Sequence, residues 1–322
     1  MENQESEDNI LAECHDILLG VPGINFSRAG EFHDPNVTKV APEAIPKAEP
    51  EGEPGMLLGL PVGYVTKDFI NFETLQEDAR AIQQALNTNK NQGNQWLLIR
   101  NLTDVAISRL ASDESPIPDI GYCFEWDGST GLLKIIHSSF LHEEIFTRLA
   151  GTIDHQLKYM NAPGGRFHKD TAYGTGQRGK SGDWVFTPPT RGLDDSGKSP
   201  SWPTLVFETG VSESYDKLVN NARWWFKASN NDVKIVLLIL MGPDEVRFAK
   251  LRRKIDSDGS VHCERVVRVT ESEIVGAPMV FPLVALYGVN RISVDGEERN
   301  VSLWKIEIGE EDFKGVVNVL SR

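Results

Sequence analysis

Cysteine is scarce in this sequence. The 322 residues include only three cysteines, and Cys14, Cys123 and Cys263 lie far apart with no Cys-x-x-Cys spacing. This excludes a disulfide framework and a cysteine-rich zinc site, because both need several cysteines at short or paired spacings. The composition therefore favours a protein that works in a reducing compartment.

Long apolar runs are missing too. No segment approaches the roughly 18 consecutive apolar residues of a membrane helix, so we expect no membrane span and no membrane partner. The first ten residues, MENQESEDNI, lack the basic and apolar regions of a signal peptide. We therefore predict an intracellular protein, cytoplasmic or nuclear. The sequence does not indicate an oligomeric state.

An excess of positive charge, common in nucleic-acid-binding proteins, is also absent, since the net charge is −14. The acidity is uneven along the chain. Residues 1–60 hold 3 basic and 12 acidic residues, whereas residues 134–234 hold 13 basic and 11 acidic residues. A nucleic-acid partner therefore stays compatible with the second half of the chain, although the charge does not favour one.

The first 120 residues divide into two parts. Residues 1–56 are acidic and include PEAIPKAEPEGEPG, so we expect a disordered tail that buries too little apolar surface to offset its ordering entropy. Residues 57–120 predict an accessory region. It contains a helix with apolar residues at three- and four-residue spacing from Phe72 to Leu86, followed by the buried strand WLLIRNL.

The signals are clearer from residue 121 to the end. The segment YCFEWDGSTGLLKII predicts a hairpin, and apolar residues at four-residue steps from Leu141 to Leu157 predict a helix. The apolar run VKIVLLILM favours a strand buried on both faces, as in a parallel pair joined by a crossover helix. Alternating segments follow. We expect an α/β fold for residues 121–322: a mixed sheet flanked by helices, with extra antiparallel strands at the C-terminus.

Two acidic residues stand in apolar surroundings. Glu208 interrupts the strand TLVFETG, and Asp183 begins the extended run DWVFTPP. If the two strands pair, both carboxylates share one end of a sheet, where clustered oxygens suit Mg²⁺ or Mn²⁺. The alternative is that Asp183 is a turn residue and Glu208 pairs with an arginine. The residues alone leave both interpretations open.

The order and spacing of these motifs resemble the PD-(D/E)XK nuclease-like superfamily, and most of all a fungal group related to the predicted restriction endonucleases of the Uma type. The resemblance covers about residues 120–245. It rests on the segments DWVFTPP, WPTLVFETGVSES, NNARWWFKAS and VKIVLLILM. It implies a restriction-endonuclease-like fold, with Asp183, Glu208 and Glu143 as ligands of Mg²⁺ or Mn²⁺, helped by a backbone carbonyl.

The sequence departs from the superfamily pattern at three positions. The first is Gly182, which stands where the superfamily has a proline before Asp183, and this change matters little chemically. Gly210 occupies the place of the E-x-K lysine, and the resemblance moves the catalytic cation to Lys217 or Arg223 on the following helix. Arginine cannot act as a base, so Arg223 would only hold and polarise the phosphate. Position 221 is Asn, where relatives often have Asp.

Two functions follow from the resemblance. The first is a Mg²⁺-dependent endonuclease-like protein that hydrolyses DNA or RNA phosphodiesters, active or degenerate. The second is a catalytically inactive binding or effector-type module that kept the fold for a nucleic-acid or protein contact. Gly210 favours the second, whereas Glu143, Asp183 and Glu208 together favour the first. We interpret GTGQRGKSGD as a flexible loop ahead of Asp183 that reaches substrate through Arg178 and Lys180.

Overall fold

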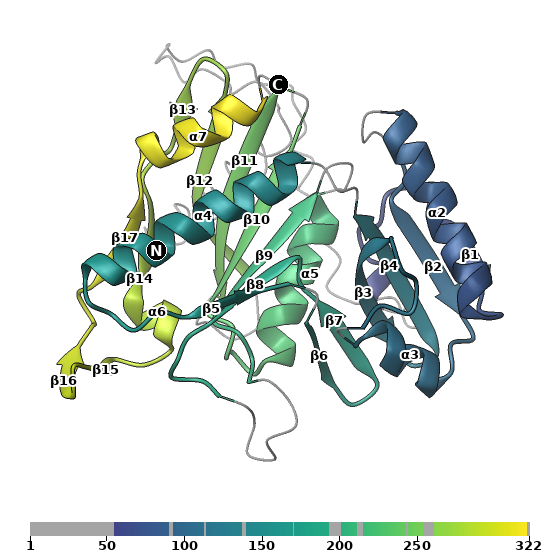
Figure 1. Ribbon diagram of the computed structural model, residues 1–322, viewed down its shortest axis with the longest axis horizontal. Helices are drawn as coiled ribbons and strands as arrows, with labels where there is room; N and C mark the ends of the chain where they lie inside the picture. Colours follow the sequence, from purple (N-terminus) through teal and green to yellow (C-terminus); the bar gives the residue numbers. More distant parts are fainter. Residues whose placement is uncertain are drawn as a thin grey trace, which may run out of the picture.

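The computed structural model describes residues 55–89, 93–112, 114–136, 140–169, 171–192, 201–210, 215–242, 244–253 and 261–320. These segments form two large β-sheets that lie side by side, with helices on their outer faces and one helix near the junction (Figure 1). The expected tail falls outside the described residues, except for Gly55 and Met56. These two belong to the short 3-10 helix η1 (Gly55–Leu57), in which Met56 is buried.

The first sheet, called sheet A, has six strands. Its order is β1 (Val65–Asp68), β2 (Trp96–Arg100), β4 (Thr130–Ile136), β3 (Gly121–Asp127), β7 (Arg178–Ser181) and β6 (Ala172–Thr175). Only β1 and β2 run parallel. The predicted boundary after residue 120 runs through this sheet, because β2 pairs with β4.

Helices α2 (Phe72–Thr88) and α3 (Asp104–Leu110) cover one face of sheet A. The apolar spacing predicted for α2 is confirmed, since Leu75, Ala79, Ile82 and Leu86 are its buried residues. Asn71 caps α2 by accepting a hydrogen bond from the backbone N–H of Thr74. The buried side chains of both helices pack with Leu133 and Ile135 of β4.

The second sheet, called sheet B, has seven strands. Its order is β13 (Ile274–Val275), β12 (Val261–Thr270), β11 (Glu245–Arg253), β10 (Ile235–Met241), β9 (Leu205–Gly210), β8 (Trp184–Thr187) and β5 (Arg166–His168). Strands β9 and β10 are parallel, joined by helix α5 (Tyr215–Ala228), and the other pairs are antiparallel. This confirms the predicted mixed α/β fold and the antiparallel strands that follow the buried run.

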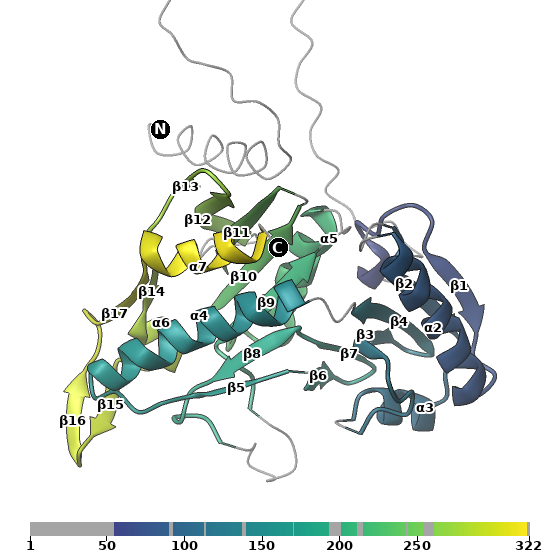
Figure 2. The same cartoon turned by 45° about the horizontal axis from the view of Figure 1, so that its top comes forward.

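Sheet B is covered on both faces. Helices α4 (Phe140–Tyr159) and α7 (Glu310–Leu320) lie together across one face (Figure 2). Helix α5 packs on the opposite face through Leu218, Ala222 and Trp225. The remaining C-terminal elements are β14 (Met279–Pro282), α6 (Leu283–Tyr287), β15 (Arg291–Val294), β16 (Glu297–Asn300) and β17 (Lys305–Ile308). Their strands form two small antiparallel pairs, β14–β17 and β15–β16. No helix of the described segments is both long and apolar enough to cross a membrane.

We predicted a flexible loop for the glycine-rich segment ahead of Asp183, and this was wrong. In the structure the segment forms the β6–β7 hairpin. A Cβ atom at Gly179 would lie 2.1 Å from the Trp126 ring, and one at Gly174 would lie 3.2 Å from the same ring. The glycines therefore let the hairpin approach the Trp126 indole closely. From composition alone, the same glycines indicate a flexible loop.

Candidate functional site

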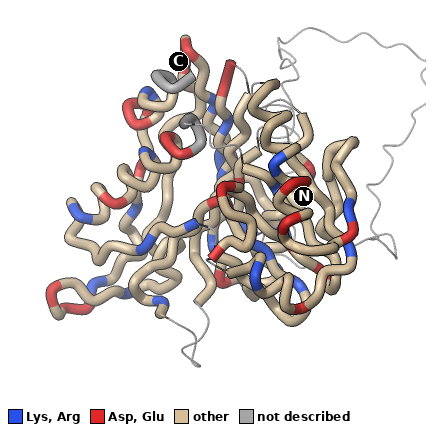
Figure 3. The backbone as a smooth tube through the Cα atoms, turned by 45° about the vertical axis from the view of Figure 1, so that its right-hand side comes forward, with Lys and Arg blue, Asp and Glu red and all other residues tan. Residues whose placement is uncertain are grey.

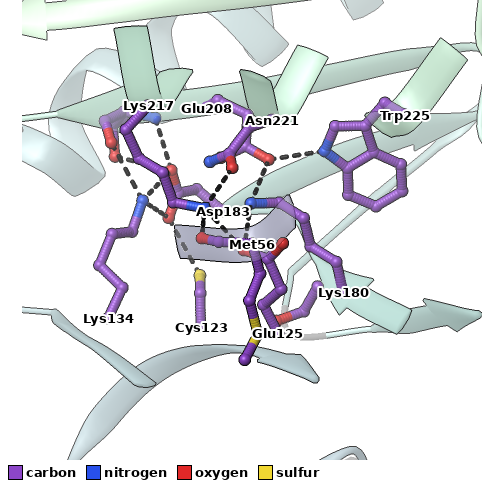
Figure 4. A network of polar contacts seen from close by, with 12 residues as sticks. Met56, Cys123, Glu125, Lys134, Lys180, Asp183, Glu208, Lys217, Asn221 and Trp225 are labelled. Carbon is purple, nitrogen blue, oxygen red and sulfur yellow. Dashed lines mark hydrogen bonds and ion pairs between the residues drawn. The ribbon is translucent and has the colours of Figure 1, made fainter. Parts of the chain in front are cut away.

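A group of six buried charged side chains lies where sheet A, sheet B and α5 meet (Figure 4). We call it the charge cluster. It holds three carboxylates and three ammonium groups, and each residue is between 1 and 7% exposed: Glu125, Lys134, Lys180, Asp183, Glu208 and Lys217. Buried charges of this kind are costly unless each is paired and hydrogen-bonded.

Strand alternation places three of these charges on the inner face of sheet A. In β4, Leu133 and Ile135 pack toward α2 and α3, so Lys134 points to the opposite face. In β3, Phe124 packs with the same helices, so Glu125 also points inward. Lys180 of β7 lies directly opposite Glu125 in the register, which brings the two charges together.

Sheet B contributes its two acids by the same rule. Trp184 pairs with Phe207 across β8 and β9, and both side chains pack on the α4 side of the sheet. The next positions along the two strands, Asp183 and Glu208, therefore share the other face, where α5 lies. The structure therefore places Asp183 and Glu208 on the same face of sheet B.

The Asp183 carboxylate receives hydrogen bonds from both sheets. The Lys134 ammonium lies 2.9 Å from each of its oxygens. The backbone N–H and the hydroxyl of Thr209 donate to Oδ2 at 2.5 and 2.8 Å, and the Cys123 thiol donates to Oδ1 at 3.0 Å. Asp183 is therefore a buried, multiply hydrogen-bonded carboxylate and not a turn residue.

Glu208 is held from three directions. The Trp225 indole N–H donates to Oε1 at 2.6 Å, and the Lys180 ammonium lies 3.3 Å from the same oxygen. The Asn221 amide donates to Oε2 at 3.1 Å. The partner of Glu208 is thus a lysine and not the arginine of the alternative interpretation, and Trp225 belongs to the core.

Asn221 links Glu208 to the rest of the charge cluster. Its amide oxygen accepts a hydrogen bond of 2.8 Å from the Lys217 ammonium, which also donates to Glu125 Oε2 at 2.8 Å and to the Met56 carbonyl at 2.9 Å. Lys180, 3.7 Å from Glu125, closes the ring back to Glu208. An ionised Asp at position 221 could accept from Lys217 but could not donate to Glu208.

The charges of this cluster balance. Three carboxylates face three ammonium groups, so the formal sum is zero when all six are ionised. Burial alone would raise the pKa of Glu125, but the positive charges of Lys217 and Lys180, helped by the hydrogen bond from Lys217, hold this pKa below its ordinary value. The lysines therefore keep Glu125 ionised.

The structure does not bring every predicted site residue to the cluster. Lys217 is a member, but Arg223 is exposed on the outer side of α5 and donates to Asn220 at 2.8 Å. Glu143 is on α4, which covers the other face of sheet B, and its half-exposed carboxylate pairs with Lys169 at 3.0 Å. Asp183, Glu208 and Lys217 thus belong to the charge cluster, whereas Glu143 and Arg223 do not.

Sequence reasoning missed Glu125 and Lys134 and assigned Lys180 to a loop. A signal was present for Lys134, because this lysine lies inside the apolar run GLLKII, whose continuous apolar character is typical of a strand buried on both faces. The same holds for Glu125 in CFEW. A lone charge in a continuous apolar strand indicates a buried partner, although it does not name the partner.

The charge cluster, as arranged, does not fit a divalent ion. Mg²⁺ requires several oxygen ligands in near-octahedral geometry and usually keeps some of its waters. Each carboxylate is already ion-paired with a lysine ammonium, and the adjoining cavity of about 10 Å³ has room for one water at most. Among the described residues, no group of three or more His, Cys, Asp or Glu side chains is arranged to hold a metal.

Comparisons with known proteins add little to this picture. No family model and no curated protein matches the sequence. One solved structure that the chain matches is described as a "putative nuclease belonging to DUF820" from Anabaena variabilis. It is 13% identical, with a TM-score of 0.37, and the match covers 61% of this chain and 90% of that chain.

Proposed function

We propose that this chain is a nuclease-like module that does not hydrolyse phosphodiesters and that keeps its fold for binding another macromolecule. One observation carries the proposal: every carboxylate of the charge cluster is neutralised by a buried lysine. A nuclease site must instead leave carboxylate oxygens open to a metal ion and a path open to the substrate phosphate.

Burial supports the same conclusion. Asp183 and Glu208 are 2% and 1% exposed. Sheet A and η1 lie over them, and the Met56 carbonyl is hydrogen-bonded to Lys217. A phosphodiester cannot approach these carboxylates while both sheets keep this arrangement.

A Mg²⁺- or Mn²⁺-dependent endonuclease is the second candidate. A specific observation favours it, because Asp183 and Glu208 share one face of paired strands, with the Lys180 ammonium 3.3 Å from Glu208. Asp183 and Glu208 are two of the three acids that the PD-(D/E)XK resemblance implies, although the lysine beside Glu208 is Lys180 and not the implied Lys217 or Arg223. This candidate requires Lys134 to leave Asp183 and sheet A to move away.

A plasmid-nicking assay with Mg²⁺ or Mn²⁺ separates the two functions. The variants Asp183→Asn and Glu208→Gln serve as matched controls, because each removes one carboxylate charge and keeps the side-chain shape. We expect the wild-type protein to nick no faster than these variants. Metal-dependent nicking by the wild type that both substitutions abolish would instead establish the endonuclease.

The nature of the bound partner is tested separately. Basic and acidic positions are interspersed over the described chain (Figure 3), so nucleic-acid binding would rest on local phosphate contacts. Fluorescence anisotropy with labelled DNA and RNA at several salt concentrations measures it, since phosphate contacts weaken steeply as salt rises. Salt-dependent binding that Asp183→Asn leaves unchanged identifies a nucleic-acid partner, whereas no binding directs the search to proteins.

A further inference from the structure

A cavity of about 500 Å³ opens between helix α3 and the turns of the two hairpins of sheet A. We call it the α3 cavity. Its volume is in the usual range of ligand pockets, and no member of the charge cluster lines it. The side chains that line it include a tryptophan, one acid and three uncharged polar residues: Trp126, Asp104, Ser108, Ser129 and Gln177. The α3 cavity is therefore a candidate binding site separate from the charge cluster.

Trp126 lies flat on the strands beside the α3 cavity. Its register partner in β7 is Gly179, which in turn pairs with Gly174 of β6, so the three residues form one row across three strands. A Cβ atom at Gly179 would lie 2.1 Å from the indole ring, and one at Gly174 would lie 3.2 Å from it. A larger residue at Gly179 would lift the ring from the sheet. The two glycines thus seat one face of the indole on the backbone of the β6–β7 hairpin.

The other face of the indole is turned away from these strands. Phe124, the neighbouring ring on the same side of β3, leans toward β4, where a Cβ atom at Gly131 would lie 2.7 Å from it. Trp126 leans the opposite way, over β7, and the two rings lie at 17° to one another with centroids 5.3 Å apart. Trp126 is half-buried and lines the α3 cavity. An accessible aromatic face attracts a second planar group or a cation.

The α3 cavity also carries a negative charge. Asp104, in the first turn of α3, is the only charged residue among the described residues that line it, and it is exposed. Ser108 follows one turn later on the same side of the helix. The surrounding sequence is acidic as well, since residues 61–133 hold 5 basic and 10 acidic residues. These charges repel a phosphate group and attract a cation.

Arginine is the side chain whose chemistry matches both features. Its guanidinium is planar and always charged, so it stacks on an indole face, and its fork of N–H donors fits a carboxylate. Ser108, Ser129 and Gln177 offer side-chain oxygens to the remaining N–H groups. A lysine ammonium would also pair with Asp104, but it is a compact and strongly hydrated charge without a planar face.

We propose that the α3 cavity binds an arginine side chain of a protein partner, held between the Trp126 ring and the Asp104 carboxylate. The inference rests on the binding function proposed above and names the partner's chemical class: a protein segment with an exposed arginine. A nucleic acid fits less well, because its phosphates would approach Asp104.

The probe is the capped pentapeptide Gly-Gly-Arg-Gly-Gly, titrated into the full chain at low salt. The indole N–H signals in ¹H–¹⁵N NMR spectra report binding, and Trp126→Phe, which keeps an aromatic ring, identifies the signal of Trp126. We expect this signal to shift saturably. The same peptide with citrulline in place of arginine keeps the planar shape without the charge. It should bind about tenfold more weakly, because it loses a charge-assisted pair.

Substitutions of exposed α3 residues test the site without disturbing the core. Asp104→Asn should weaken binding of the arginine peptide about tenfold. The matched control is Glu73→Gln, which removes a negative charge from the first turn of α2 and should leave the affinity unchanged. Ser108→Arg places a guanidinium one helical turn from Asp104, so it should block the peptide by occupying the site.

The inference is overturned if no saturable shift occurs up to about 10 mM peptide, or if the citrulline peptide binds as well as the arginine peptide. It is also overturned if Asp104→Asn or Ser108→Arg binds the arginine peptide like the wild type. Larger shifts of the Trp126 signal with oligothymidylate than with the arginine peptide would assign the α3 cavity to nucleic acid instead. Metal-dependent nicking by the wild type, in contrast, would refute the proposed non-catalytic function whatever the peptide shows.

Discussion

Lys217 offers the sharpest test of how the charge cluster is held together. Its ammonium is 1% exposed and donates to the Glu125 carboxylate, the Asn221 amide oxygen and the Met56 carbonyl, all within 2.9 Å. Lys217→Met removes the charge and keeps the length of the side chain. The Glu125 carboxylate would then have only Lys180, at 3.7 Å, as a cation within ion-pair distance in the described structure.

The magnitude follows from the loss of one partner of a buried ion pair. Leaving the other charge buried and uncompensated costs about 3–5 kcal/mol. The double variant Lys217→Met/Glu125→Gln restores the charge balance. It loses mainly the hydrogen bonds to Asn221 and Met56, at about 1–3 kcal/mol for each buried group left unsatisfied. We therefore expect the double variant to be more stable than the sum of the two single changes predicts, by about 2 kcal/mol.

Urea unfolding at pH 7, followed by tryptophan fluorescence, measures the free energy of unfolding of four proteins: the wild type, Lys217→Met, Glu125→Gln and the double variant. The exposed pair Lys169–Glu143 supplies the control, because both side chains are 48% exposed and Lys169→Met should cost less than about 1 kcal/mol. Additivity of the two cluster variants within about 0.5 kcal/mol would refute the reasoning. It would mean that Lys217 and Glu125 do not share a buried ion pair.

Two further changes probe neighbouring features. The pKa of Glu125 is held below the ordinary value of 4.5, so its contribution to stability is complete above that value and is lost as pH falls through the lower, folded-state pKa. Denaturant unfolding between pH 7 and 3 should therefore show that Glu125→Gln loses stability less steeply than the wild type. Parallel curves for the two proteins would contradict this. Gly179→Ala should lower the free energy of unfolding by about 1–3 kcal/mol through overpacking against Trp126. Gly151→Ala, in α4 with open space around it, should be neutral or stabilising by up to about 1 kcal/mol. Equal melting temperatures for the two variants would rule out the close approach of Gly179 to Trp126.

Much of the fold was predictable because local patterns determine it. The apolar spacing of α2, the β3–β4 hairpin and the unit β9–α5–β10 all follow from periodicity within a single segment. The β6–β7 hairpin was missed because its glycines make room for the ring of Trp126, which belongs to another strand. Contacts of that kind join residues distant in sequence, and periodicity carries no information about them.

The candidate site was predictable in part for the same reason. Asp183, Glu208 and Lys217 lie on or beside consecutive elements of one sheet and its crossover helix, so their common place in the charge cluster follows from strand pairing and from the packing of α5 on sheet B. Glu125 and Lys134 come from sheet A, and the docking of two sheets is not encoded in either one alone. Without these two residues, the acids indicate a metal site; with them, the same acids form a neutral network.

The response of wild-type stability to divalent ions tests the central claim most directly. The melting temperature is measured in EDTA and in excess Mn²⁺, with Asp183→Asn alongside. Because lysines already neutralise the carboxylates, we predict the same melting temperature in both conditions. A rise in Mn²⁺ that Asp183→Asn abolishes would contradict the account, since anything that binds only the folded state stabilises it.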